Sequence, residues 1–111
     1  MTESQLQSAV FKWFRSQYNK LPELALAYHV RNEGKHHSAG TKAGIPDICI
    51  PAPCGAWGAM YIELKTISGR ISDIQYRTML ALQDCGNHVV VCRSLEDVKI
   101  EVAAYFAEGK Q

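Results

Sequence analysis

The fold of this 111-residue chain is decided by two short runs, Pro46-Asp47-Ile48-Cys49-Ile50 and Met60-Tyr61-Ile62-Glu63-Leu64-Lys65. Both have the apolar composition of strands, and the segment between them is rich in proline and glycine, which favours a turn. Side chains alternate across a strand, so Tyr61, Glu63 and Lys65 share one face of the second run. We therefore expect neighbouring strands that bring Asp47, at the head of one, close to Glu63, near the end of the other.

Capping boxes predict where two helices begin outside these strands. Thr2 with Gln5 opens a helix that runs to about Gln17, with Leu6, Val10, Trp13 and Phe14 on its apolar side. Ser72 with Gln75 opens a second helix, which Gly86 ends as a left-handed cap. Its apolar side is expected to hold Met79, Leu80 and Leu82. Ser94 caps a third helix to about Ala107, whose inward residues are predicted to be Val98, Val102, Tyr105 and Phe106.

Two further strands complete the expected order, α-β-β-β-α-β-α. The first is a short alternating run over residues 27–31, which follows a break at Leu21-Pro22. The second, over residues 88–92, is apolar without interruption, which is typical of a strand buried on both faces at the centre of a sheet. The chain is short enough for one domain, so we expect a single α/β domain over residues 1–111.

Composition excludes several classes of protein. Hydrophobic residues make up 47% of the chain and charged residues 21%, which is ordinary globular usage rather than that of a disordered chain. No apolar run is long enough for a membrane span, and the N-terminus has no pattern of a signal peptide, so we expect a cytoplasmic protein. The four cysteines, at positions 49, 54, 85 and 92, fit no paired zinc or disulfide spacing and are interpreted as reduced thiols.

Asp47, Glu63 and Lys65 form the constellation that can carry chemistry. Two converging carboxylates repel each other unless one is protonated or a cation lies between them, and such oxygen ligands suit Mg²⁺ or Mn²⁺. Lys65 is then close enough to orient or deprotonate a water molecule and to offset charge on a phosphate, as phosphodiester hydrolysis requires. By itself, however, a Glu-x-Lys at a strand end is usually a surface ion pair.

Glu3 lies on the apolar stripe of the first helix, where packing does not explain it. A carboxylate there needs a partner, although an acid that only complements the helix dipole can point anywhere. The residues alone leave both interpretations open.

The runs Gly44-Ile45-Pro46-Asp47 and Ile62-Glu63-Leu64-Lys65 resemble the motifs of the PD-(D/E)xK nucleases. Nearly the whole chain resembles their VRR-Nuc branch, the virus-type replication-repair nucleases, in the stand-alone form of phages and bacteria. The resemblance implies a restriction-endonuclease-like mixed sheet flanked by helices, located in a bacterial host cell. It also implies a catalytic lysine at Lys65, metal ligation by Asp47, Glu63, Glu3 and the carbonyl of Leu64, and a site glutamine at Gln75.

The activity that this resemblance implies is divalent-metal-dependent DNA endonuclease cleavage with Mg²⁺ or Mn²⁺, structure-selective for branched DNA such as a Holliday junction, in replication, recombination or repair. The resemblance also implies a homodimer with two sites, and no membrane partner. The alternatives are a non-catalytic module of the same fold that binds DNA or a repair partner, and a purely structural protein in which Glu63 and Lys65 form a surface pair.

Candidate contacts to nucleic acid lie mainly in the long connection over residues 33–46, which leads directly into Asp47. They are Lys35, Lys42, His36 and His37, with Arg70 beside the second helix; solvation is the alternative for the histidines and for Arg70. Trp57 can be a core residue, a dimer contact or a wedge against bases.

The near-neutral total charge of +1 does not exclude a nucleic-acid partner. It comes from 12 basic and 11 acidic residues. If Glu3, Asp47 and Glu63 belong to a metal, eight acids remain and the balance of the rest becomes +4. Up to Lys42 the chain has six basic residues against three acids, whereas from Ser94 onward two basic residues face four acids, and this uneven balance suits an acidic metal site on a basic surface.

Overall fold

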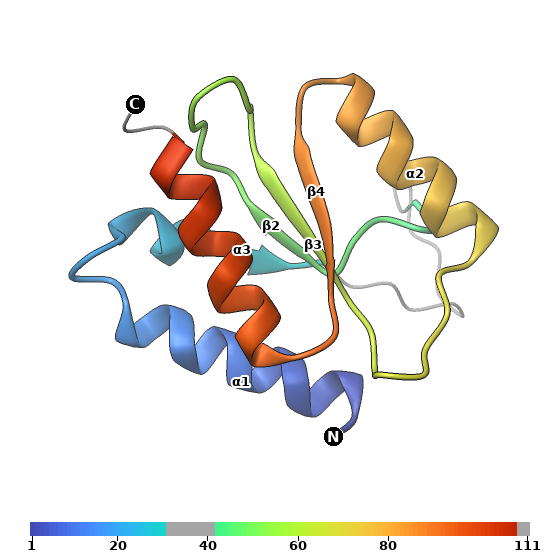
Figure 1. Cartoon of the computed structure of the whole chain (residues 1–111), viewed down its shortest axis with the longest axis horizontal. Coiled ribbons are helices and arrows are strands. Elements are labelled where there is room, and N and C mark those ends of the chain that lie inside the picture. The colour runs from blue at the N-terminus through green and yellow to red at the C-terminus, as the bar shows by residue number, and fades with distance from the viewer. Residues whose placement is uncertain (31–41, 109–111) are drawn as a thin grey trace.

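A computed structural model describes residues 1–30 and 42–108. They form a mixed four-stranded sheet with helices on both faces, in the order α1 (Glu3–Ser16), η1 (Pro22–Leu26), β1 (Tyr28–His29), β2 (Ile48–Ile50), β3 (Met60–Leu64), α2 (Asp73–Asp84), β4 (His88–Cys92) and α3 (Leu95–Glu108) (Figure 1). The expected α/β class and element order are confirmed. The short 3₁₀ helix η1 is an addition, since only a break at Pro22 is predicted there.

The strands lie in the order β1-β2-β3-β4. β1 and β2 are antiparallel, β2 and β3 are antiparallel, and β3 and β4 are parallel. The parallel pair is joined through α2, which lies on one face of the sheet, while α1 and α3 cover the other (Figure 1). The face of the sheet under α1 and α3 therefore forms the main core, and the opposite face can hold some polar side chains.

The main core lies between the sheet and the pair α1 and α3. Alternation along the strands sends the side chains of β2 and β3 that share one face into this core. Its buried members are Leu6, Val10, Phe14, Leu24, Ile48, Ile50, Ala52, Met60, Ile62, Leu64, Cys92, Val98, Val102, Tyr105 and Phe106. The four inward residues predicted for α3 are all buried, and Trp13 of α1 packs against the cluster while half-buried.

Three expectations about the strands and α2 are wrong. The run at 88–92 is not central: among the described strands β4 lies at one edge of the sheet beside β3, and its apolar residues are covered by α2 and α3. Within the described residues, β1 covers only Tyr28–His29 of the predicted 27–31, and both side chains are exposed. Leu80 is 43% exposed, because it lies about 100° around α2 from the buried Met79.

The predicted helix ends are confirmed at several positions. Both capping boxes are present, with Thr2 and Gln5 on α1 and Ser72 and Gln75 on α2. Gly86 has φ +90°, and its amide donates to Gln83 while the Asn87 amide donates to Leu82, which is a Schellman ending. None of the described helices is long and apolar enough to cross a membrane.

Candidate metal centre

Asp47 and Glu63 are brought together by the register of β2 and β3. Ile48 pairs with Ile62 in this antiparallel ladder, so one step outward places Asp47 opposite Glu63 on the same face of the sheet. Asp47 is anchored there because its Oδ2 accepts a hydrogen bond of 2.8 Å from the backbone amide of Leu64. The same contact holds the Leu64 backbone at the site, although its carbonyl as a metal ligand stays a prediction.

Gly44 explains how the segment before Asp47 reaches its place. Its φ of +83° lies in the left-handed region, and a Cβ there would meet Ile74 Cγ2 of α2 at 2.5 Å and Thr78 Oγ1 at 2.9 Å. Only glycine combines this conformation with so close an approach. The chain therefore lies directly against α2 just before Pro46 and Asp47.

Glu3 reaches the two carboxylates from the first position of α1. The capping box at Thr2 fixes where that helix begins, and so fixes the place of Glu3. One carboxylate oxygen each from Glu3, Asp47 and Glu63 lies within 4.8 Å of the others. Glu3 is exposed, Asp47 half-buried and Glu63 only 2% exposed, so the group forms an acidic site open to solvent on one side.

Glu63 has the most perturbed environment in this cluster. Burial raises its pKa to about 8, and the neighbouring Asp47 and Glu3 carboxylates act in the same direction, while Lys65 opposes them. The cause is the cost of a negative charge that has lost its water and lies beside other negative charges. A cation between the carboxylates relieves this cost, so the three residues fit a hard divalent metal such as Mg²⁺ or Mn²⁺.

Gln75 contacts the cluster from α2. Its Oε1 accepts from the backbone amide of Ser72 at 2.9 Å, while its Nε2 donates to Glu63 Oε2 at 3.1 Å. One side chain therefore closes the capping box and orients the buried carboxylate. Because the box fixes the amide, the donor is aimed at Glu63 independently of any ligand.

Lys65 lies beside the same oxygen. Its Nζ is 3.8 Å from Glu63 Oε2, and its side chain is only 12% exposed. Its backbone amide donates to Cys92 of β4 at 3.0 Å, which continues the parallel ladder past the end of β3. The predicted common face of Glu63 and Lys65 thus places an ammonium at the edge of the carboxylate cluster.

Arg93 is a residue of this region that the sequence did not single out. Its Nη1 donates to the carbonyls of Thr66, Ile67 and Gly69 at 2.8, 3.3 and 2.7 Å. It thereby ties down the loop that leads from Lys65 toward Gln75. Its position directly after β4 could have indicated a place in this region, because the carboxyl ends of parallel strands meet at one edge of the sheet.

Of the five predicted contacts to nucleic acid, two lie among the residues that the structure describes. Lys35, His36 and His37 lie outside them. Lys42 and Arg70 are described, and both are exposed. The structure gives Arg70 no hydrogen bond or ion pair with the described residues, so its side chain is accessible to a solvated anion.

Trp57 and His88 lie away from the carboxylates, near the start of β3. Trp57 is half-buried, packs against the main core and lies 5.1 Å from the His88 ring, which stacks on Tyr105 at 5.9 Å. These contacts favour the core interpretation of Trp57. The four cysteines are free thiols, as expected, with Cys49 and Cys92 buried.

The match to a known family covers the whole of this arrangement. A sequence model of the VRR-NUC domain matches residues 1–96, which include all three carboxylates, Lys65 and Gln75. The chain belongs to the VRR-NUC family. Its structure is similar to a solved structure named "VRR_NUC domain protein", with a TM-score of 0.87 and 27% sequence identity over 98% of this chain and 91% of that one. No curated protein matches the sequence. The VRR-NUC membership gives the chain a nuclease-type fold.

Proposed function

We propose that this VRR-NUC chain is a divalent-metal-dependent DNA endonuclease that hydrolyses phosphodiester bonds. The observation that carries the proposal is the convergence of Glu3, Asp47 and Glu63 within 4.8 Å, with an ammonium on the same edge of the sheet. Three carboxylates so close together are costly without a cation. The membership in a nuclease family supports the same conclusion.

Glu3, Asp47 and Glu63 would hold the metal, and the Leu64 carbonyl would add an oxygen. A bound Mg²⁺ or Mn²⁺ supplies charge neutralisation and Lewis-acid polarisation of a phosphate oxygen. Gln75 keeps Glu63 Oε2 turned toward the cluster. The Lys65 ammonium offsets the additional negative charge of the pentacovalent transition state, and its low exposure strengthens that interaction relative to water.

We further propose that the preferred substrate is branched DNA and that the enzyme acts as a homodimer with two sites. A two-fold dimer presents two equivalent centres, which suits a symmetric four-way junction. A chain of 111 residues also has a thin core, so burial of surface against a second copy adds stability. Sedimentation that shows only monomer at micromolar concentration contradicts the homodimer.

The test is cleavage of four-way junctions, flaps, duplex and single strands, with Mg²⁺ and Mn²⁺ tested separately. We expect metal-dependent cleavage that Asp47→Asn and Lys65→Ala each lower by about 100-fold or more, the scale of losing one charge-stabilising group. Lys12→Ala, an exposed lysine of α1 outside the cluster, serves as the control and should cleave like the wild type. Cleavage by the two site variants at the wild-type rate contradicts the assignment, and DNA binding without turnover supports the non-catalytic module.

A further inference from the structure

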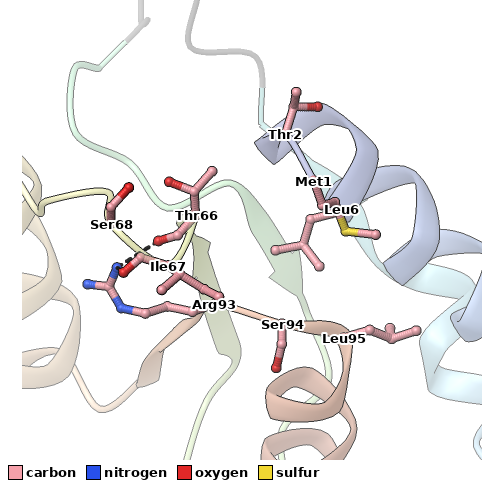
Figure 2. Close-up of a pocket in the computed structure, with 9 residues that line it drawn as sticks. All are labelled: Met1, Thr2, Leu6, Thr66, Ile67, Ser68, Arg93, Ser94 and Leu95. Atoms are coloured by element: carbon pink, nitrogen blue, oxygen red, sulfur yellow. Dashed lines mark hydrogen bonds between the residues drawn. The ribbon is translucent and has the colours of Figure 1, made fainter.

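A cavity of about 480 Å³ lies next to the carboxylate cluster, between the start of α1, the loop at residues 66–68 and the start of α3 (Figure 2). Two of its lining residues are direct sequence neighbours of the site: Thr2 precedes Glu3, and Thr66 follows Lys65. A phosphodiester held at the carboxylates carries its sugar and base only a few bonds away. The cavity is therefore placed to receive a part of the substrate next to the reacting phosphate.

The lining has the chemistry of a site for a nucleobase. Ile67 and Leu6 lie on opposite sides of the cavity, and because Leu6 is only 2% exposed, the apolar contact to a planar ring comes mainly from Ile67 (Figure 2). The hydroxyl groups of Thr66 and Ser68 complete the lining, together with those of Thr2 and Ser94, whose oxygens already accept hydrogen bonds from the amides of Gln5 and Asp97 as helix caps. A hydroxyl both donates and accepts hydrogen bonds, so such a lining satisfies the polar edge of any base without selecting one.

The loop wall of the cavity is fixed before any ligand arrives. Arg93 Nη1 holds the carbonyls of Thr66 and Ile67, and the Arg93 amide itself donates to Asp97 Oδ2 at 2.9 Å. Held in this way, Ile67 remains 88% exposed, so its side chain is available for contact. A preformed wall lowers the entropy that a ligand loses on binding.

We propose that this cavity binds an unpaired nucleobase next to the phosphodiester that is cleaved. A base stacked and paired inside a duplex cannot enter it, whereas a base at a branch point or in a single strand can. The inference rests on the proposed nuclease function and narrows its substrate class to branched DNA in which the nucleotide next to the cleaved bond is unpaired. The expected preference is for unpaired structure and not for sequence.

The experiment compares Ile67→Ser with Ile100→Ser. Both isoleucines are exposed, at 88% and 59%, so neither substitution opens a hole in the core, and Ile100 lies on α3 outside the cavity lining. Binding is measured in Ca²⁺ with two DNA probes of equal length that carry 2-aminopurine, unpaired in one and paired in the other. We expect the wild type and Ile100→Ser to bind the unpaired probe more tightly, and Ile67→Ser to lose about fivefold in affinity for that probe alone, the scale of one lost apolar contact to a base.

The outcomes separate this inference from the proposed function. The base site is contradicted if Ile67→Ser keeps the wild-type preference for the unpaired probe, if both variants lose it equally, or if the wild type does not distinguish the probes. In each of these cases, metal-dependent cleavage still supports a nuclease. If no DNA is cleaved but the loss at Ile67 is observed, the nuclease proposal fails while the base site stands. Melting temperatures of both variants near that of the wild type exclude a folding defect as the cause.

Discussion

Gln75 Nε2 donates to Glu63 Oε2 at 3.1 Å, while Oε1 of the same side chain accepts from the amide of Ser72 at 2.9 Å. The capping box of α2 and the carboxylate cluster therefore share one residue. Because α2 also connects the two parallel strands, the point where this helix begins determines how Glu63 is presented. The side chain of Gln75 thus fixes both the start of α2 and the orientation of the buried Glu63.

Removal of this shared contact should affect activity more than removal of the cap alone. Gln75→Ala loses the hydrogen bonds of its side chain with the Ser72 amide and with Glu63. Ser72→Ala loses only the hydrogen bond that the Gln75 amide donates to Ser72 Oγ. Each is expected to lower the free energy of unfolding by about 1 kcal/mol, as for other N-cap losses. Gln75→Ala should also lower kcat by about tenfold, which is within the range for groups that orient metal ligands. Equal kcat values in the two variants would show that Gln75 acts only as a cap.

Glu3 should contribute to metal affinity and not only to its helix. Glu3 and Asp73 are each the first residue of a helix with a capping box, so Glu3→Gln and Asp73→Asn lose the same favourable interaction with a helix dipole. Only Glu3 lies in the carboxylate cluster. We expect Glu3→Gln to weaken Mn²⁺ binding by about 10- to 100-fold in calorimetry, and Asp73→Asn to leave it unchanged. Unchanged Mn²⁺ affinity in Glu3→Gln would show that Glu3 interacts only with the helix dipole.

The parts of the fold that follow from the sequence are those governed by local contacts. Both capping boxes and the Schellman ending at Gly86 involve residues within five positions of one another, so their patterns can be recognised without knowing the rest of the fold. Asp47 and Glu63 are also recognisable, because two adjacent strands joined by a turn leave few registers open.

The parts that could not be predicted depend on distant pairings. The apolar run of β4 is equally compatible with a central strand and with an outer strand covered by two helices, and only the strand order distinguishes them. Leu80 and Arg93 illustrate the same limit. The first is exposed because the buried side of α2 carries Met79 instead, and the second becomes important through a loop more than twenty positions away.

The metal-free protein should lose stability as pH rises, because of Glu63. Its pKa is raised from 4.5 to about 8, so between these values the folded state keeps a proton that the unfolded state has lost. The stability is fully present below pH 4.5 and is lost as pH rises through 8. We expect the melting temperature in chelator to fall more between pH 5.5 and 8.5 for the wild type than for Glu63→Gln, which has no carboxyl at this position. An equal fall in melting temperature for the wild type and Glu63→Gln would contradict this account.

The close approach of Gly44 to α2 should make Gly44→Ala more damaging than Gly86→Ala. Both glycines have a positive φ, so both substitutions carry a conformational cost of about 1–2 kcal/mol. A Cβ at Gly86 meets nothing within 4 Å, whereas at Gly44 it overlaps Ile74. Gly44→Ala should therefore be the less stable in urea unfolding and should also lower cleavage, because Asp47 follows three positions later. Equal stabilities would mean that the loop moves aside at no cost.

Arg93 should stabilise the loop between Lys65 and α2 through the three carbonyls that its Nη1 contacts. Arg93→Ala leaves those carbonyls to water, and we expect a loss of about 2 kcal/mol in the free energy of unfolding, the scale for hydrogen bonds to a charged donor. Because Lys65 and Gln75 lie at either end of this segment, kcat should fall as well. Arg77→Ala removes an exposed arginine of α2 and is the control. Limited proteolysis should cut within residues 66–69 in Arg93→Ala only. Equal resistance of both variants would show that the loop is held by its other contacts.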